Sequence, residues 1–376
     1  MIVLKKTSIL SLILILLASF SLPPVTVNAE DSKENQEVDA ALKQIFADRA
    51  QTLIDQQTER IKGFYLSQQT LSKNAYHNES NRTVYINAWA AKRAVKLVKA
   101  NSSIRIIRRN VNGDTAKVSL VQSLKLSYVY LNEVFPPQSF GIGTRHFMTL
   151  KKINGSWKIA REWYLDPLDE NPDKIADSPD GLAPSVKPTA TVSGKSRRYN
   201  RSRAIAYADK YAGTAWGAGN QHRYNRKYLD YTGKGGDCTN FASQAVGDPE
   251  EGGGLPMKSG WRYFYPTGGT QTWVQTDAFR NFLLRSGYGN MVAKGTYKEV
   301  VAPSRKYTHG AISQLQAGDL IGYIMHRNDT DHFSVITGFD EYGYPLVNSH
   351  TADRYRVPFD LGWDKYTKYE LIHIRD

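Results

Sequence analysis

The sequence predicts an α+β fold in two parts, each of which places its helices before an antiparallel sheet. Apolar residues recur first at helical spacing and then with a period of two, and this order occurs twice along the chain. Asn-Gly turn signals at 112–114 and 154–156 separate the alternating segments of the first part. Residues 166–196 are rich in Pro, Asp, Ser and Gly, which is typical of a linker between two domains.

The first part, residues 30–165, begins with helical patterns and ends with two predicted hairpins. Apolar side chains such as Leu42 and Phe46 predict helix within 31–70, and a second helix is expected at 84–100. Strands are predicted at 103–111, 115–131, 144–153 and 156–165. At the level of pattern, this part resembles a cystatin-like or nuclear-transport-factor-like α+β domain. Its sequence shows no convergent set of His, Cys and carboxylates, so we expect a binding or spacer role.

The second part, residues 197–376, repeats the order of helices before strands. Helices are predicted at 202–212 and 277–287, and strands at 318–325, 332–339, 346–351 and 368–375. An irregular stretch rich in aromatic residues and glycine connects the two predicted helices. We therefore expect helices that pack on an antiparallel sheet in this part as well.

The N-terminus has the order of a secretory signal peptide. "MIVLKK" supplies positive charge, an apolar run follows, and "VNA" ends at Ala29. The run is shorter than the roughly 20 residues that a membrane span requires, so we expect residues 1–29 to be cleaved rather than to anchor the chain. The protein is then expected to be secreted or associated with the cell wall, with no membrane span after cleavage.

The charge balance is strongly basic: 49 Lys and Arg stand against 36 Asp and Glu, a formal net charge of +13. For an exported protein this excess favours anionic wall polymers or lipid headgroups, although ordinary solubilising charge explains it equally well. No zinc-finger spacing or compact basic helix indicates a specific nucleic-acid partner. Scattered histidines and the lack of a phosphate-binding glycine motif predict neither a metal nor a cofactor.

Cys238 is the only cysteine, so the chain cannot form an intramolecular disulfide. It lies in "GGDCTNFASQ", residues 235–244, where the glycines favour a turn and Asp237 is a good helix N-cap. Cys238 would then occupy the first turn of a buried helix. The free N–H groups there lower the pKa of a thiol and can hold an oxyanion. The alternative is a core cysteine that packs under the glycine turn.

A histidine at the start of a predicted strand supplies the base that a thiol nucleophile requires. His332 begins the strand 332–339, at a sheet edge that a helix N-terminus can reach. Asn348 and His350 lie two residues apart in the next strand, hence on one face, and either can orient the imidazole of His332. Packing would explain His332 alone, but together with Cys238 it is interpreted as catalytic.

The second part resembles the bacterial putative amidase domain family. The resemblance rests on "YNRSRAIAYADKYA", "GGDCTNFASQ", "GDLIGY", "HFSVITG" and "SHTADR", in that order, of which "GGDCTNF" is the most specific. This part is also similar to papain-like peptidoglycan hydrolases, which carry a cysteine on a helix, a histidine on a strand and then a polar orienting residue. The resemblance implies a papain-like α+β domain with Cys238 as nucleophile and His332 as base.

The resemblance leaves two positions open. The "SHT" element favours His350 as the orienting residue, whereas the papain-like pattern favours Asn348, with Asp331 and Asp340 as the next candidates. "NRKYLDY" resembles a family element and offers Asn225 near the oxyanion, although a turn-forming asparagine explains it more simply.

Taken together, these features predict a secreted thiol-dependent amidohydrolase that cleaves an amide or peptide bond, with cell-wall peptidoglycan as the expected substrate. A non-catalytic wall-binding or adhesion protein with an idle cysteine is the alternative, and the presence of both Cys238 and His332 argues against it. Acyl transfer to an amine instead of water is equally compatible with the sequence.

Overall fold

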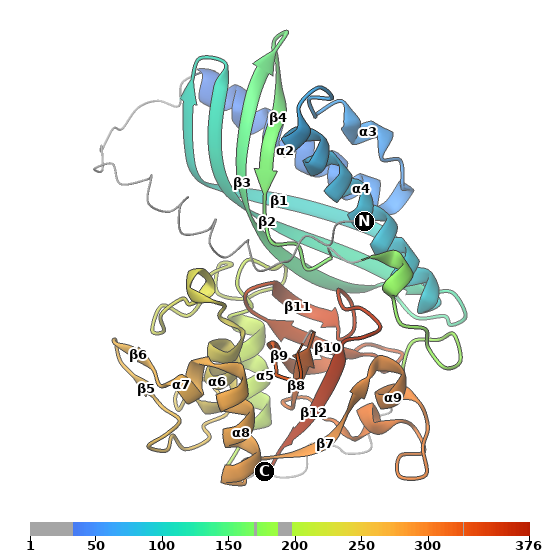
Figure 1. Ribbon diagram of the computed structural model, residues 1–376, viewed down its shortest axis with the longest axis vertical. Helices are drawn as coiled ribbons and strands as arrows, with labels where there is room; N and C mark the ends of the chain where they lie inside the picture. The colour runs from blue at the N-terminus through green and yellow to red at the C-terminus, as the bar shows by residue number, and fades with distance from the viewer. Residues whose placement is uncertain (1–32, 169–170, 187–197, 326) are drawn as a thin grey trace. The chain divides into compact units, whose positions relative to one another are not determined.

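The computed structural model describes residues 33–168, 171–186, 198–325 and 327–376 (Figure 1). The chain divides into two units, 1–37 and 38–376, and the second holds nearly all the described residues. The predicted signal peptide lies outside the described residues. No helix within those ranges is both long enough and apolar enough to cross a membrane.

The first part consists of helices packed on one face of four antiparallel strands (Figure 1). The helices are α2 (Lys33–Asp55), α3 (Glu59–Lys62) and α4 (Thr70–Lys92), and the strands are β1 (Val95–Asn112), β2 (Thr115–Tyr130), β3 (Gln138–Ile153) and β4 (Ser156–Trp163). Leu42 and Phe46 of α2 pack in one core cluster with Leu150 and Ile159 of the sheet. Both predicted hairpins are therefore confirmed.

The second predicted helix, at 84–100, is partly wrong. Helix α4 ends at Lys92, and Ala94 takes a left-handed conformation with φ 51°, which turns the chain into β1. Two of the first three residues of β1, Val95 and Leu97, are buried at 2% exposure. Alternation over these residues is a strand pattern, and packing against the sheet outweighs the helical spacing that precedes it.

The second part contains five helices and eight strands within its described residues. The helices are α5 (Arg201–Lys210), α6 (Cys238–Gly247), α7 (Gln271–Val274), α8 (Thr276–Ser286) and α9 (Tyr297–Val301). The strands are β5 (Tyr263–Phe264), β6 (Gly268–Gly269), β7 (Gly289–Thr296), β8 (Leu320–Ile324), β9 (His332–Phe339), β10 (Pro345–Ser349), β11 (Asp353–Pro358) and β12 (Lys368–Ile374). Short 3₁₀ helices cover Pro172–Lys174, Thr232–Lys234 and Ala311–Gln314. Helices and antiparallel strands in both parts confirm the predicted α+β class.

A single ten-stranded sheet joins the two parts. Its order is β1-β2-β3-β11-β10-β9-β8-β12-β7, with β4 paired to β3. At the junction, Asp353 of β11 pairs with Gly143 of β3. A Cβ on Gly143 would lie 2.2 Å from Oγ1 of Thr214 and 2.5 Å from the nitrogen of Ala215, so only glycine lets the 211–217 loop approach the sheet this closely.

The two parts also share buried polar contacts and a hydrophobic core. Arg93, at the end of α4, bonds Asp360 with its Nη2 at 2.7 Å, and Nε1 of Trp89 donates to the same carboxylate at 3.1 Å. Ile175 and Ala183, within the segment predicted to be a linker, are buried in the core cluster that spans both parts. The division into two domains at 166–196 stays a prediction, and the two parts share this core.

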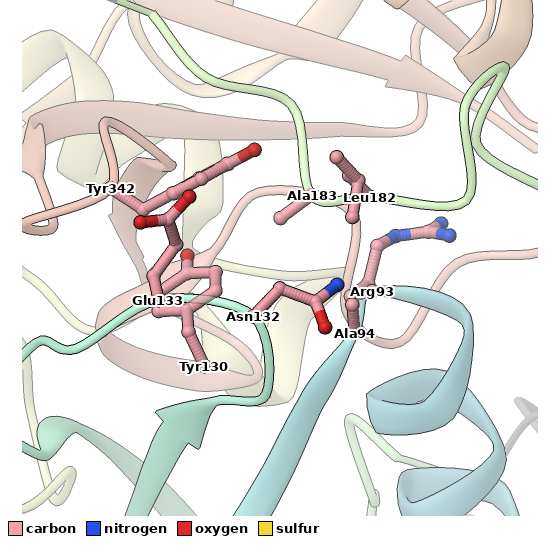
Figure 2. A pocket seen from close by; sticks show the side chains of 8 residues that line it. All are labelled: Arg93, Ala94, Tyr130, Asn132, Glu133, Leu182, Ala183 and Tyr342. Atoms are coloured by element: carbon pink, nitrogen blue, oxygen red, sulfur yellow. The ribbon is translucent and has the colours of Figure 1, made fainter.

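A small pocket lies beside this junction (Figure 2). Figure 2 shows Tyr130, from the end of β2, and Tyr342, from the turn after β9, on one side of it. Their rings stack with centroids 4.7 Å apart, and the guanidinium of Arg93 on the other side is bonded to Asp360. The aromatic and cationic walls are therefore already engaged by groups of the same chain.

Candidate active site

Helix α6 begins at Cys238 because the chain turns through two glycines with left-handed backbones. Gly235 and Gly236 have φ of 105° and 124°, which residues with a side chain rarely adopt. The helix then packs in one core cluster with β9, through Phe241 of α6 and Phe333 of the strand. The predicted buried helix with Cys238 in its first turn is therefore present.

Asp237 occupies the N-cap position, but its side chain does not cap the helix backbone. Its Oδ2 lies 2.6 Å from Nδ1 of His350, while Oδ1 accepts from the N–H of Tyr231 at 2.9 Å and from Nδ2 of Asn240 at 2.8 Å. The capping expectation is therefore wrong. The carboxylate ties the start of α6 to the histidine that follows β10.

The thiol of Cys238 is buried, with 7% exposure. Burial raises the pKa of this thiol above its ordinary value, and the nearby carboxylate of Asp237 raises it further. Hydrogen bonds from the N–H of Phe333 and from Thr239 oppose this rise without cancelling it. The lowered pKa expected for the helix start is therefore wrong for the free protein, because burial and the charge of Asp237 outweigh the hydrogen bonds to the sulfur.

His332 is the first residue of β9, directly before the Phe333 whose N–H reaches the sulfur. Its ring lies 5.7 Å from Tyr323 and 5.4 Å from Trp363, centroid to centroid, and its Nε2 is buried without a hydrogen-bond partner. Burial and then the charge of Arg354 lower the pKa of His332 to about 3. The imidazole is therefore neutral near pH 7. Within the described ranges, no hydrogen bond joins it to Cys238.

Nε of Arg354 also lacks a hydrogen-bond partner, whereas Ser334 and Trp363 both face the hydroxyl of Tyr323. Arg354 is only 2% exposed, and its guanidinium donates to the carbonyls of Leu361 and Pro167 rather than to a carboxylate. Its charge lies 5.2 Å from the ring of Trp363. Buried polar groups are usually satisfied, so a buried histidine without a partner beside an arginine without a carboxylate makes this neighbourhood a candidate for function.

His350 does not contact His332 through a hydrogen bond. Its Nδ1 faces Asp237, and its Nε2 lies 2.6 Å from the carbonyl oxygen of Tyr211. Both partners offer oxygen acceptors, so the ring is held from two sides. Tyr224 and Phe241 stack on its two faces at 3.6 and 4.0 Å. The structure thus makes His350 a link between α6 and the 211–217 loop.

Asn348 is engaged on the same side of the sheet. Its Oδ1 accepts from Oγ1 of Thr337 at 3.0 Å and from the N–H of Arg356 at 2.6 Å, and its Nδ2 donates to Asp209 at 2.9 Å. Neither candidate for the orienting role is therefore bonded to His332 in this state. The catalytic roles predicted for these residues stay predictions.

The remaining candidates have structural partners. Oδ1 of Asn225 accepts from the N–H of Lys227 at 3.0 Å, as expected of a turn-forming asparagine. Asp340 accepts from three successive N–H groups of the turn after β9, the closest being that of Tyr344 at 2.8 Å. Oδ2 of Asp331 accepts from the N–H of Met325 at 2.7 Å.

Sequence reasoning missed a buried ionic cluster in the first part, where no convergent set was expected. Arg49 donates to Glu162 with Nη1 at 2.9 Å and to the hydroxyl of Tyr65 with Nη2 at 2.7 Å. His146 faces Glu162 with Nδ1 at 2.8 Å and Oγ1 of Thr144 with Nε2 at 2.7 Å. The available signal was Arg49 itself, a charge on the apolar face of a predicted helix.

Comparison with known proteins gives a family match for the second part. Residues 198–372 match the model of the family described as Putative amidase domain, which confirms the predicted resemblance. The description of that family points, at a coarse level, to hydrolase chemistry of the amidase type for the second part. A curated relative, Uncharacterized protein YjcM of Bacillus subtilis (strain 168), is 27% identical over 168 residues. The match covers 43% of this chain and only 32% of that relative.

Solved structures match about a third of the chain. They include an NTF2-like protein from Cytophaga hutchinsonii (12% identity, 35% of this chain and 97% of that one, TM-score 0.22). A protein with a cystatin-like fold from Nostoc punctiforme is 15% identical over 36% of this chain and 93% of that one, with a TM-score of 0.23. At these scores the likeness carries no argument about function. Within the part of the chain that the structure describes, no group of three His, Cys, Asp or Glu residues is arranged to hold a metal ion.

Proposed function

We propose that the chain is a secreted thiol-dependent amidohydrolase that cleaves an amide bond of cell-wall peptidoglycan, with Cys238 as nucleophile and His332 as base. The observation that carries the proposal is the position of the sulfur. It lies at the first residue of a buried helix, and that helix packs in one core cluster with the strand that begins at His332. The amidase-type domain and the basic charge of the chain support the substrate class.

In the proposed reaction, the thiol proton of Cys238 passes to the neutral imidazole of His332 as the sulfur attacks the amide carbonyl. N–H groups at the start of α6 hold the oxyanion of the tetrahedral intermediate. The protonated His332 then gives its proton to the leaving amine, which leaves a thioester on Cys238. Water, deprotonated by His332, attacks the thioester, and a carboxylic acid and the free thiol are released.

The free protein favours the neutral forms of both partners. Burial raises the pKa of the Cys238 thiol and lowers that of His332, so the thiolate–imidazolium pair is disfavoured before substrate binds. Proton transfer is then coupled to attack on the carbonyl. His350 and Asp237 act as positioning residues in this proposal, because their bond fixes the start of the helix that carries the nucleophile.

The test is mass spectrometry of purified peptidoglycan after incubation with the chain. We expect new fragments whose mass gain equals one water and which carry a free amine and a free carboxylate. Cys238→Ser and His332→Asn should release none, and Tyr366→Ala, an exposed site in the same domain with 62% exposure, should act like the parent. Fragments released equally by Cys238→Ser would refute thiol catalysis.

Binding without fragments in every variant would favour the alternative, a wall-binding protein with an idle cysteine. The raised pKa of the buried thiol is the observation on that side. Fragments coupled to an added amine instead of water would show acyl transfer by the same site.

A further inference from the structure

The four-stranded sheet of the first part has one face covered by α2–α4 and another that the helices leave open (Figure 1). On the open face two large aromatic side chains are exposed, Phe147 at 54% and Trp163 at 43%. They are direct partners across β3 and β4, with ring centroids 5.9 Å apart and planes tilted by 35°. A buried role does not explain them, and an exposed apolar patch with a polar rim marks an interaction site.

Exposed cations flank these rings. Residues that pair directly across antiparallel strands share a face, so the register defines which side chains accompany Phe147. One neighbouring row is Asn110, Lys117, Thr149 and Arg161, and the other is Arg105, Val121 and Arg145. Arg105, Lys117 and Arg161 are exposed. No carboxylate belongs to these described rows, and of their cations Arg145 is paired with Asp353 of β11.

Arg145, on the open face, contacts residues that lie beside the candidate active site. Arg145 pairs with Asp353 at 3.2 Å, and its guanidinium lies 5.0 Å from the centre of the Tyr224 ring. Tyr224 in turn stacks on His350. Arg145 therefore links the open face, through buried side chains, to the histidine that is bonded to Asp237 at the start of α6.

We propose that this face, defined by Arg105, Lys117, Phe147, Arg161 and Trp163, binds an acidic glycan strand. Sugar rings present apolar C–H faces that pack on exposed aromatic rings, and carboxylate or phosphate groups accept charge-assisted hydrogen bonds from Arg and Lys. Charge complementarity selects an acidic polymer over a neutral one. Continuity with an amidase-type domain favours a glycan over a nucleic acid. The inference concerns binding and does not depend on the thiol chemistry.

The experiment measures binding of hyaluronan oligosaccharides, as a defined acidic glycan, to the Cys238→Ser chain by titration calorimetry. Dextran supplies rings without charge, polyphosphate supplies charge without rings, and oligo-dT represents nucleic acid. We expect hyaluronan to bind more tightly than dextran or oligo-dT, with affinity that falls as salt rises. The double variant Phe147→Ala/Trp163→Ala should weaken hyaluronan binding about tenfold or more and leave polyphosphate binding nearly unchanged.

Two further variants complete the test. Arg105→Gln/Lys117→Gln should weaken both acidic ligands, whereas the matched pair Lys43→Gln/Lys73→Gln on the helices should not. Tyr366→Ala is the aromatic control. Equal binding of hyaluronan to the Phe147→Ala/Trp163→Ala variant and its parent would overturn the proposal. So would oligo-dT binding that is tighter than hyaluronan binding and lost with the same residues, because that result assigns the face to nucleic acid.

Discussion

The two parts of the molecule each bury a histidine near an arginine, but the hydrogen-bond and ionic partners of these side chains differ. In the first part, both ring nitrogens of His146 have partners, and the neighbouring Arg49 is paired with the carboxylate of Glu162. In the second part, Nε2 of His332 has no partner, and the nearby Arg354 bonds only main-chain carbonyls. In the first cluster the buried arginine is paired with a carboxylate, although its Nε also lacks a hydrogen-bond partner, whereas in the second cluster the buried arginine faces no carboxylate.

The difference separates a structural network from a reactive one. Paired charges and satisfied donors fix a core, since breaking them leaves an uncompensated buried charge. Unpaired groups raise the free energy of the folded protein, and chains retain them where chemistry requires them. We therefore assign stability to the cluster around Glu162 and reactivity to the surroundings of His332.

The largest expected contrast is in activity. Replacing the base should lower kcat/KM for peptidoglycan hydrolysis by roughly 10²–10⁴ in His332→Asn, because general-base catalysis contributes about that much. The matched His146→Asn should leave kcat/KM unchanged when rates are divided by the folded fraction, measured by circular dichroism. If His146→Asn is the inactive variant, the two clusters have been assigned the wrong way round.

The reverse contrast is in stability. Burial opposes the charge of Glu162, but Arg49 and His146 outweigh it and lower the pKa of this carboxyl to about 2. Glu162→Gln leaves the buried Arg49 with only the more distant carboxylate of Glu79, at 3.5 Å, so we expect a loss of about 3 kcal/mol in the free energy of unfolding in urea. The exposed Glu59→Gln should change it by about 0.5 kcal/mol or less. If Glu162→Gln and Glu59→Gln both change the free energy of unfolding only slightly, the pair of Arg49 and Glu162 does not stabilise the fold.

His332 should also shape the pH dependence of stability. Its folded pKa of about 3 lies below its ordinary value of 6.5, so the unfolded chain binds more protons between these two values. The stabilisation from the neutral ring is full above pH 6.5 and is lost as pH falls toward 3. His332→Asn should remove this loss, which amounts to on the order of a few kcal/mol between pH 6.5 and pH 3. An unchanged slope in urea titrations across that range would mean that the pKa of His332 is the same in the folded and unfolded chain, which contradicts a buried neutral ring.

The smallest effect concerns the seam between the two parts. A methyl group on Gly143 would meet Thr214 and Ala215 within 2.5 Å, so Gly143→Ala should cost about 1–3 kcal/mol. Gly338→Ala, in β9 with no atom within 4 Å of the added carbon, is the matched control and should be near neutral. Thermal unfolding of both variants provides the comparison. Identical midpoints would show that the 211–217 loop does not rest on β3.

The order of helices and strands was predictable because periodicity is local. The turn at Gly235–Gly236, the helix that starts at Cys238 and the strand that starts at His332 all follow from nearby residues. The pairing of β3 with β11 was not predictable, since no local pattern around Gly143 or Asp353 indicates which distant strand it pairs with.

The surroundings of the candidate site depend on the same long-range pairing. Arg354 and Trp363 lie near His332 although they are more than 20 residues away in the sequence. Asp237 bonds His350 instead of capping the helix. The pKa of the Cys238 thiol could not be inferred from its position on the helix, because burial of the sulfur raises this pKa.

The central claim, chemistry at the sulfur, is tested most directly by titrating the single thiol. Because Cys238 is the only cysteine, one iodoacetamide label per chain, counted by intact mass spectrometry, identifies the modified atom. We predict that amine release from peptidoglycan falls in proportion to the labelled fraction and reaches zero at full labelling, while circular dichroism stays unchanged. A fully labelled, folded chain that still releases amines at the original rate would contradict the account.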